Sequence, residues 1–593
     1  MLSTSSYSKT LIRDNLSRFS VLPLLGFVAL FAAGILPGLM SYRRFVYVSQ
    51  YSESVMKGSA FTINAIITII AIISAVWVFG YLHENAQAGA MHRMPVTRKS
   101  LFGSAVISGW IMTAIPIIAF AIMTFVLRGA SSTEKQIYDI YSSFMIRPLP
   151  AAEIFTAAHA LSFAIKSLVT ASFVFAVSCL AAVISGRKTI HALLAMFLLV
   201  LPVTLAVQTE SLCRGYLQGF DGLNINYKLL GALGFAVSDE EFRIHAGYTA
   251  YYIVLSIALL ALALWIYKRV RLERVGNATT FQIAGDILAS LLTIICTFGT
   301  AQLFASATSG SEAEKPVRFV ISALIASAVF YAIMRMIADS SPVIFNKKTL
   351  RQYGICLAII AVITSITVLD VTGYSNRIAK IADAEDIESI HIKSGFPSNI
   401  TEVDDDFTDP ETIEAVAGLR EAIYLDRKVS DENDYGSETF ELTWKLKNGK
   451  EIKRTYEART GKQFKKTNAA LKKLYESEAY KEKVAIDVET VLKKTDKIEL
   501  YGTGVYGSKD EDYVRISKED EKELLEALNK DLKAVSYDRI KEYTGESDTE
   551  DLVYVEISYI NADADDGSSG CSYAISEKDK NAMQFLKDKG YIR

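Results

Sequence analysis

Long apolar stretches dominate the first 372 residues of this chain, and no stretch of similar length follows them. The hydrocarbon core of a bilayer is about 30 Å thick, so a helix needs roughly 20 apolar residues to cross it. A backbone in lipid must satisfy its own hydrogen bonds, and each stretch is therefore expected to be a helix. The candidate spans are 20–40, 60–82, 101–127, 166–185, 190–208, 249–267, 281–306, 318–339 and 353–370. The sequence thus predicts a polytopic α-helical membrane protein with about nine transmembrane helices.

The remaining residues, 373–593, form a hydrophilic tail of opposite charge. Residues 1–372 carry 28 Lys and Arg against 17 Asp and Glu, whereas the tail carries 35 against 49. A length of 593 residues with half of them hydrophobic suits a membrane domain joined to a sizeable soluble domain. Only Cys571 of the five cysteines lies in the tail, and none belongs to a CxxC pair. Neither a disulfide framework nor a zinc site is expected.

Basic loops predict the orientation of the helices, because short loops rich in Lys and Arg stay on the cytoplasmic side. With the N-terminus in the cytoplasm, every inner segment is basic: Lys9, Arg13 and Arg18; Arg93, Arg98 and Lys99; Arg187 and Lys188; Lys268, Arg269, Arg271 and Arg274; Lys347, Lys348 and Arg351. The first stretch lacks the short apolar core and cleavage site of a secretory signal, so it is counted as a span. Nine spans place the tail outside the plasma membrane, and one span more or fewer would reverse this.

The tail has the pattern of an α+β domain containing a repeated unit. In 373–490, a strand at Ile387–Ile392 precedes a helix that starts at Asp409-Pro410, an N-cap followed by a first-turn proline. Two strands joined through Asn448-Gly449, a hairpin signal, and a helix at 467–484 complete the unit. In 491–593 the order recurs: a strand at Ile498–Val505, a helix capped by Ser517, strands at Leu552–Ile560 and Cys571–Ile575, and a helix with Met583 and Phe585. We expect a duplicated βαββα unit, although order alone can coincide, and a surface turn at Asp404-Asp405-Asp406.

The loop 83–100 between the second and third apolar stretches differs from an ordinary connector. It is long enough for a short interfacial helix, and Pro95 would end that helix before the next span. Its polar and charged side chains include Glu84, His92, Arg93, Thr97, Arg98 and Lys99. Two interpretations remain open. The loop is either a basic anchor at the lipid headgroups or a lever that a cytoplasmic partner pushes.

No residues of the chain form a recognisable catalytic or nucleotide-binding motif. Gly186-Arg187-Lys188-Thr189 resembles the end of a phosphate-binding loop, but the earlier glycine is missing from the required spacing. A basic loop between two spans is the better interpretation. We therefore expect no catalytic residue, cofactor or metal ligand in this chain. If ATP drives the protein, another subunit binds it.

Four ionisable residues lie in or beside the predicted spans, where charge is costly and often functional. His159 and Lys166 are seven residues apart and so share one face of a helix. They fit an outer interfacial helix at 154–165, with Lys166 reaching back to the interface. Asp286 and Arg335 can pair between the seventh and eighth spans. That pair has two interpretations, a structural ion pair or part of a substrate site.

Two stretches, Ala86–Phe102 and Tyr267–Phe281, resemble the ABC-2-type permeases of ATP-binding-cassette transporters, particularly the Ytr-like permeases of Gram-positive bacteria. The resemblance implies a six-span core at 20–280, to which 281–372 adds further helices. It also implies that the loop 83–100 forms a coupling helix that docks into a groove of the ATPase. The N-terminal segment 1–19, with Ile12, Leu16 and Phe19 on one face, resembles the interfacial helix of the family. The outer segment 209–248 is similar in place to the re-entrant helices of the family.

The resemblance implies a permease subunit of an exporter that moves a peptide, a lipid or an antimicrobial compound. Its expected partners are a dimer of cytoplasmic ABC ATPase subunits, a second permease chain of the same or a related kind, and the lipid bilayer; no nucleic acid is expected. A second hypothesis is a sensor whose acidic tail binds a cationic, envelope-active peptide. A third is a structural envelope protein without transport.

Overall fold

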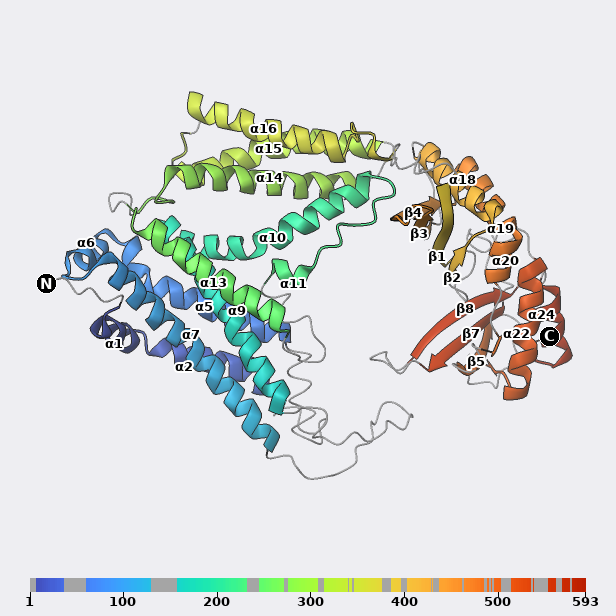
Figure 1. Cartoon of the computed structure of the whole chain (residues 1–593), viewed down its shortest axis with the longest axis horizontal. Helices are drawn as coiled ribbons and strands as arrows, with labels where there is room; N and C mark the ends of the chain where they lie inside the picture. The colour runs from blue at the N-terminus through green and yellow to red at the C-terminus, as the bar shows by residue number, and fades with distance from the viewer. Residues whose placement is uncertain are drawn as a thin grey trace. The chain divides into compact units, whose positions relative to one another are not determined.

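The structure is a computed structural model of the chain, and Figure 1 shows its helices and strands. It describes residues 7–36, 60–129, 157–231, 245–270, 276–307, 314–375, 386–395, 403–427, 437–460, 463–484, 495–502, 514–534, 553–560, 568–575 and 579–592, with the single positions 429, 488, 489, 492 and 537 and without 340, 344 and 345. Parts of the predicted elements at 20–40, 154–165, 209–248 and 498–505 therefore lie outside the described residues.

Eight helices within the described part of the chain are long and apolar enough to cross a membrane. They are α5 (Ala60–Val78), α7 (Arg98–Gly129), α9 (Ala157–Ile184), α10 (Lys188–Tyr216), α13 (Ala246–Tyr267), α14 (Gln282–Ala307), α15 (Lys315–Asp339) and α16 (Lys347–Thr367). All eight coincide with predicted stretches. A bent pair of helices counts as a ninth candidate if the two helices form one span. In this pair, α1 (Lys9–Arg18) meets α2 (Val21–Leu30) and the π-helical turn η1 (Phe31–Ile35) at an angle of 55°. The chain therefore has the helices of a multi-pass membrane protein.

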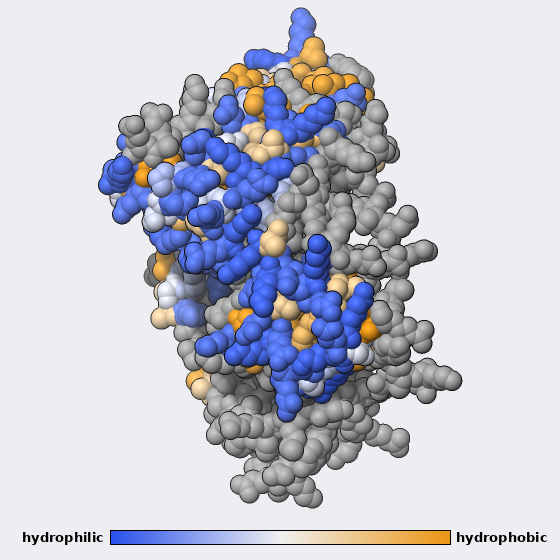
Figure 2. Space-filling view, turned by 90° about the vertical axis from the view of Figure 1, so that its right-hand side faces the viewer, coloured by the Kyte–Doolittle hydropathy of each residue, from blue (hydrophilic) through white to orange (hydrophobic). Residues whose placement is uncertain are grey.

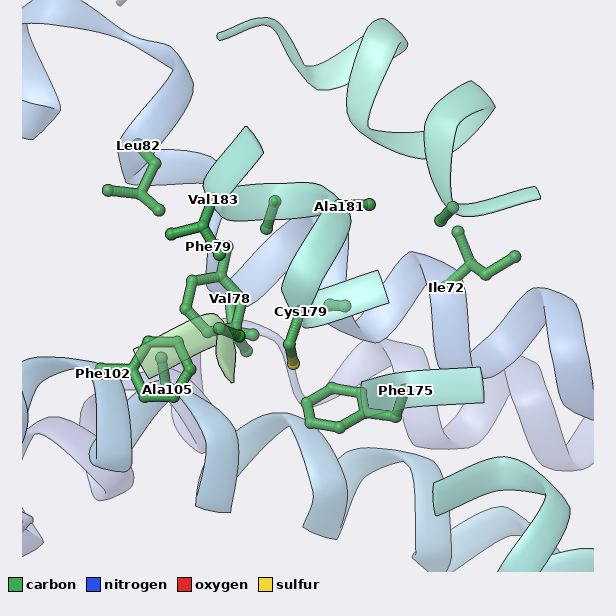
Figure 3. Packing of buried hydrophobic residues seen from close by; sticks show 14 of the residues in the cluster. Ile72, Val78, Phe79, Leu82, Phe102, Ala105, Phe175, Cys179, Ala181 and Val183 are labelled. Atoms are coloured by element: carbon green, nitrogen blue, oxygen red, sulfur yellow. The ribbon is translucent and has the colours of Figure 1, made fainter. Parts of the chain in front are cut away.

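Residues 1–209, 224–299 and 325–358 form one of two compact units, and α9 is the central helix of this unit. The helices α5, α7 and α13 pack on α9, while α1 and α2 pack on α7. The span of α9 is 72% buried, whereas those of α10 and α13 are 17% buried. Figure 3 shows the packing around Phe79, Phe102, Phe175 and Cys179 in the main apolar core. The burial of α9 explains why its apolar residues are not confined to one face.

The first helix packs against α7 through small polar side chains. The backbone N–H of Ser8 donates to Ser104 Oγ at 2.8 Å, and Asn15 Nδ2 donates to Ser108 Oγ at 3.0 Å. Phe19 packs against the main core and lies 5.5 Å from the Trp77 ring. The amphipathic face expected for the N-terminal segment thus contacts the helix bundle.

The tail contains two four-stranded antiparallel sheets of the same strand order, β2-β1-β3-β4 and β6-β5-β7-β8. The strands are β1 (Ile387–Ser394), β2 (Val403–Phe407), β3 (Ser437–Leu446), β4 (Glu451–Arg459), β5 (Thr495–Gly502), β6 (Val514–Arg515), β7 (Val553–Ile560) and β8 (Ser568–Ile575). The helices are α18 (Pro410–Asp426), α19 (Lys465–Glu476), α20 (Glu478–Val484), α22 (Lys518–Ala534) and α24 (Lys580–Asp588). Figure 2 faces the tail and shows a mainly hydrophilic surface on its described residues.

The same helix cap closes the unit around each sheet. Asp426, at the end of α18, accepts a hydrogen bond from the backbone N–H of Thr467 in α19 at 2.8 Å. Asp531, near the end of α22, accepts one from the N–H of Ala582 in α24, also at 2.8 Å. A carboxylate is favourable there because the first N–H groups of a helix have no partner within the helix. Each sheet thus has one pair of helices, α18 with α19 and α22 with α24, that is joined in the same way.

Several local predictions for the first sheet are confirmed, and two are wrong. Asp409 caps α18 through Thr412 N at 2.7 Å, and Gly449 turns between β3 and β4 with a φ of +79°. The helix expected at 467–484 is interrupted at Ser477, which separates α19 from α20. The expected turn at Asp404-Asp405-Asp406 is instead the middle of β2. Strand structure is possible there because Asp404 and Asp406 bond to His391, while Asp405 pairs with Lys483 at 2.5 Å.

Candidate functional site

A short helix, α6 (Asn85–Arg93), lies between α5 and α7 and has one bonded side and one exposed side. It follows a single 3-10 turn, η2 (Gly80–His83), and ends before Pro95, which cannot continue it. Thr97 then caps α7, since its Oγ1 accepts from Ser100 N at 3.1 Å. The loop 83–100 therefore contains a short helix, as its length and Pro95 predict.

A chain of hydrogen bonds ties α6 to the end of α13. The Tyr267 hydroxyl lies 3.2 Å from His92 Nε2 and 3.2 Å from the Tyr81 hydroxyl. The other ring nitrogen of His92 lies 2.9 Å from the Ala88 carbonyl oxygen. These distances fit a neutral His92 that donates from Nδ1 and accepts at Nε2, and burial lowers the pKa of this histidine. His92 therefore faces the helix bundle.

An ion pair ties the start of α6 to the start of α10. Lys188 Nζ donates to Glu84, and so does Gln87. The hydrogen bond from Lys188 is the main cause of the lowered pKa of Glu84. The Lys188 side chain also passes close to Gly80, where an added Cβ would lie 3.3 Å from its Cε. Both charged groups are about half exposed, so the pair positions α6 more than it stabilises the fold.

Two buried histidines link the start of α10 to η2, the turn that precedes α6. His83 Nε2 lies 3.3 Å from His191 Nδ1, and His191 Nε2 lies 2.8 Å from the Ser178 carbonyl oxygen. His83 is 6% exposed. Burial, followed by the nearby Lys188 charge, lowers the pKa of His83 to about 4. His83 is therefore neutral at neutral pH, and α10 is joined to η2 by a polar contact inside the protein.

Arg98, at the start of α7, binds the segment that follows α13. Its Nη1 donates to the carbonyl oxygens of Lys268 at 3.1 Å and Val270 at 3.3 Å. Carbonyls at a helix end lack partners within the helix, and a cation there is favourable. Arg98 therefore has a structural role in this protein.

The turn between α9 and α10 pairs with the segment after α13. Gly186 donates to the Ala278 carbonyl oxygen at 3.2 Å, and Gly276 donates to the Gly186 carbonyl oxygen at 3.0 Å. The Arg187 side chain donates to the Gly276 carbonyl oxygen at 2.5 Å. Gly186-Arg187-Lys188-Thr189 is thus a turn whose basic side chains bind neighbouring parts of the chain.

The opposite side of α6 and its following turn is exposed and partly basic. The exposed residues are Asn85, Ala86, Ala90, Arg93, Met94, Pro95, Arg98 and Lys99. Of the predicted loop residues, Glu84, His92, Thr97 and Arg98 thus make the structural contacts described above. Arg93, Pro95 and Lys99 face outward. The sequence pattern does not single out His83, His191 or Tyr267, because their contacts join distant residues. His83 and His191 are 108 positions apart, and Tyr81 and Tyr267 are 186 apart.

The structure brings together Asp286 and Arg335, the pair suggested by the sequence. Asp286 on α14 bonds to Arg335 on α15 and accepts from Gln352 Nε2 on α16 at 2.8 Å. Lys348 Nζ lies 3.3 Å from the same carboxylate, and Asp339 lies 2.7 Å from the Arg335 guanidinium. This network joins three helices.

His159 and Lys166 both lie on α9, so no separate helix ends between them. The side chain of His159 lies outside the described residues. Lys166 is 5% exposed, and the interpretation that it reaches out to the interface is wrong. It is buried because α9 is surrounded by α5, α7 and α13.

A family model described as a domain of unknown function, DUF6449, matches residues 444–547. The match begins on β3 and extends through β4, α19, α20, β5, β6 and α22, so it includes parts of both sheets. No curated protein and no solved structure matches the chain. The family resemblance found by this comparison is therefore confined to part of the tail.

Proposed function

We propose that this chain is the permease subunit of an ATP-binding-cassette exporter and that a separate cytoplasmic ATPase docks on α6. The observation that carries the proposal is the two-sided construction of α6. Its inner side is bonded to the end of α13 through His92, and its N-cap Glu84 is bonded to the start of α10. The turn η2 just before it is joined to α10 through His83. The outer side of α6 presents Arg93 and Lys99 to solvent. A helix that serves only as a headgroup anchor needs no such bonded inner side.

The hydrogen bonds and the ion pair of α6 suit it to couple a movement of the partner to the helix bundle. A helix held through Glu84 and His92 moves with the elements to which these residues bind, the start of α10 and the end of α13. ATP-driven closure of a partner would thereby bias α10 and α13 between two arrangements, provided that the partner binds one arrangement more tightly. The ABC-2-type and Ytr-like resemblance of Ala86–Phe102 favours this role over an anchor. The exposed apolar faces of α10 and α13 are available to lipid and to a second permease chain.

The contacts at the helix ends support the proposed topology in the plasma membrane. The start of α14, the end of α15 and the start of α16 meet at Asp286, as alternating spans require. The residues 210–223, which include the end of α10, belong to one compact unit with the tail. Four candidate spans, α13 to α16, separate residues 210–223 from the tail. An even number of spans leaves both on the same side of the membrane, as their shared unit requires. We place α6 in the cytoplasm and the tail outside.

The proposal is tested by purifying the tagged full-length chain from its host membranes in mild detergent and identifying its partners by mass spectrometry. We expect an ABC ATPase to co-purify with the wild type. Arg93→Glu combined with Lys99→Glu should reduce that recovery by about tenfold, because both reversals place repulsive charge on the docking face. Arg98 is left unchanged because its guanidinium binds the segment after α13.

The control carries Lys450→Glu and Lys453→Glu, which reverse two exposed charges in the tail, and should retain the ATPase. Absence of any ATPase from the wild-type preparation would contradict the proposed function. Equal recovery with the α6 variant would contradict the docking face alone.

A further inference from the structure

The segment 217–223, which follows α10, lies against the first sheet of the tail, within one compact unit. The backbone N–H of Gln218 donates to Ser375 Oγ at 3.2 Å. The Thr455 hydroxyl on β4 donates to Asp221 Oδ1 at 3.0 Å. The ring of Phe220 lies 6.4 Å from that of Tyr374, which in turn packs against the core of the first sheet. Polar and aromatic contacts therefore join this segment to the tail.

Gly219 is at the centre of this contact. Its φ is +72°, a region that residues with a Cβ rarely adopt. A Cβ built on it would lie 2.9 Å from the hydroxyl oxygen of Tyr456 and 3.0 Å from two ring atoms. Tyr456 lies on β4, the edge strand of the sheet, and is 5% exposed. The close approach of the segment to β4 thus requires glycine for two independent reasons.

The same contact has an energetic cost. The buried Tyr456 hydroxyl has no hydrogen-bond partner among the described residues. Burial raises the pKa of Tyr456 to about 12, so the group is a neutral hydroxyl. Leaving a buried hydroxyl unpaired costs about 1–3 kcal/mol, and opening the contact would return it to water. This penalty offsets part of the stabilisation from the two hydrogen bonds and the aromatic contact. The free energy needed to release the segment 217–223 from β4 is therefore small.

We propose that the segment 217–223 and β4 form a latch through which the tail controls the outer end of α10. The first two turns of α10 carry Lys188 and His191, which bond to Glu84 and His83 beside α6. One helix therefore connects the latch to the proposed docking site. This control of transport rests on the proposed function, whereas the latch itself does not. It supplies the sensor hypothesis with a mechanism, because a ligand that moves β4 would act on α10.

The latch is tested by hydrogen exchange of the full-length protein in detergent, read out by mass spectrometry. Gly219→Ala should raise exchange of the segment 217–223 by about tenfold or more, which corresponds to a loss of about 1.4 kcal/mol. Tyr456→Phe should lower exchange there, because it removes the unpaired hydroxyl and keeps the ring. Gly449→Ala is the control, since Gly449 has a φ of +79° but nothing within 4 Å of its built Cβ. Unchanged exchange of 217–223 in Gly219→Ala, or an equal change in Gly449→Ala, would overturn the latch.

ATP hydrolysis by the co-purified complex tests whether the latch exerts control. Gly219→Ala should change the hydrolysis rate at least about twofold, a shift of about 0.4 kcal/mol, while Gly449→Ala leaves it unchanged. If the latch opens and hydrolysis stays the same, control by the tail is overturned. If no ATPase co-purifies, the proposed function fails, and the exchange measurement still decides whether the latch exists.

Discussion

Replacing Asp286 by alanine is expected to destabilise the protein by about 3 kcal/mol, the lower end of the cost of removing one partner of a buried ion pair, because Asp339 still lies beside Arg335. The side chain of Arg335 is 3% exposed, so its charge cannot move into water when the carboxylate is lost. Gln352 and Lys348 on α16 lose the same partner. One substitution therefore removes the contacts by which Asp286 on α14 holds α15 and α16.

The thermal midpoint of the purified full-length protein measures this effect. Asp339→Ala is the matched control, because it removes the other carboxylate near Arg335, which is 32% exposed, and leaves Asp286 in place. The control should cost about 1 kcal/mol. The double replacement Asp286→Leu with Arg335→Leu should recover most of the loss, since no charge stays buried. Equal midpoints for Asp286→Ala and Asp339→Ala would contradict the central role of Asp286.

Acidification from pH 7 to pH 5 is expected to destabilise the helical unit by about 2 kcal/mol through His83. Burial lowers the pKa of His83 to about 4 in the folded protein, against roughly 6.5 in an unfolded chain. Folding therefore favours the neutral form of His83. The contribution of this histidine to the free energy of unfolding is complete above about pH 6.5. Unfolding takes up a proton below that pH, so the contribution is lost progressively down to about pH 4.

The measurement compares unfolding of the wild type and His83→Gln at several pH values between 7 and 5. The variant should show a shallower loss of stability, because glutamine does not titrate. His245→Gln removes an exposed histidine and should follow the wild type. Parallel pH profiles for wild type and His83→Gln would show that His83 is accessible to protons in the folded protein.

Local sequence signals predicted much of the fold. Eight apolar stretches became helices because length and composition alone decide this property in lipid. The cap at Asp409 and the turn at Gly449 were predictable because each depends on residues adjacent in the chain. The position of α6 also followed from loop length and from Pro95.

Contacts between distant residues could not be predicted. Glu84 and Lys188 are 104 positions apart, and Asp221 and Thr455 are 234 apart. Nothing in the local pattern shows that His92 turns inward while Arg93 turns outward. The short strand β2 was missed because its three consecutive aspartates are unfavourable in strands. Its partners meet it only in the folded tail, where His391 on β1 bonds to Asp404 and Lys483 on α20 pairs with Asp405.

Cysteine labelling tests most directly the claim that α6 and the tail lie on opposite sides of a membrane. Single cysteines at Ala90 on α6 and at Lys453 on β4, both exposed, are introduced into a full-length chain whose five native cysteines are replaced. Intact cells are treated with a maleimide that does not cross membranes. Lys453→Cys should react in intact cells, whereas Ala90→Cys should react only after the membrane is opened. Labelling of both positions from the same side would contradict the account.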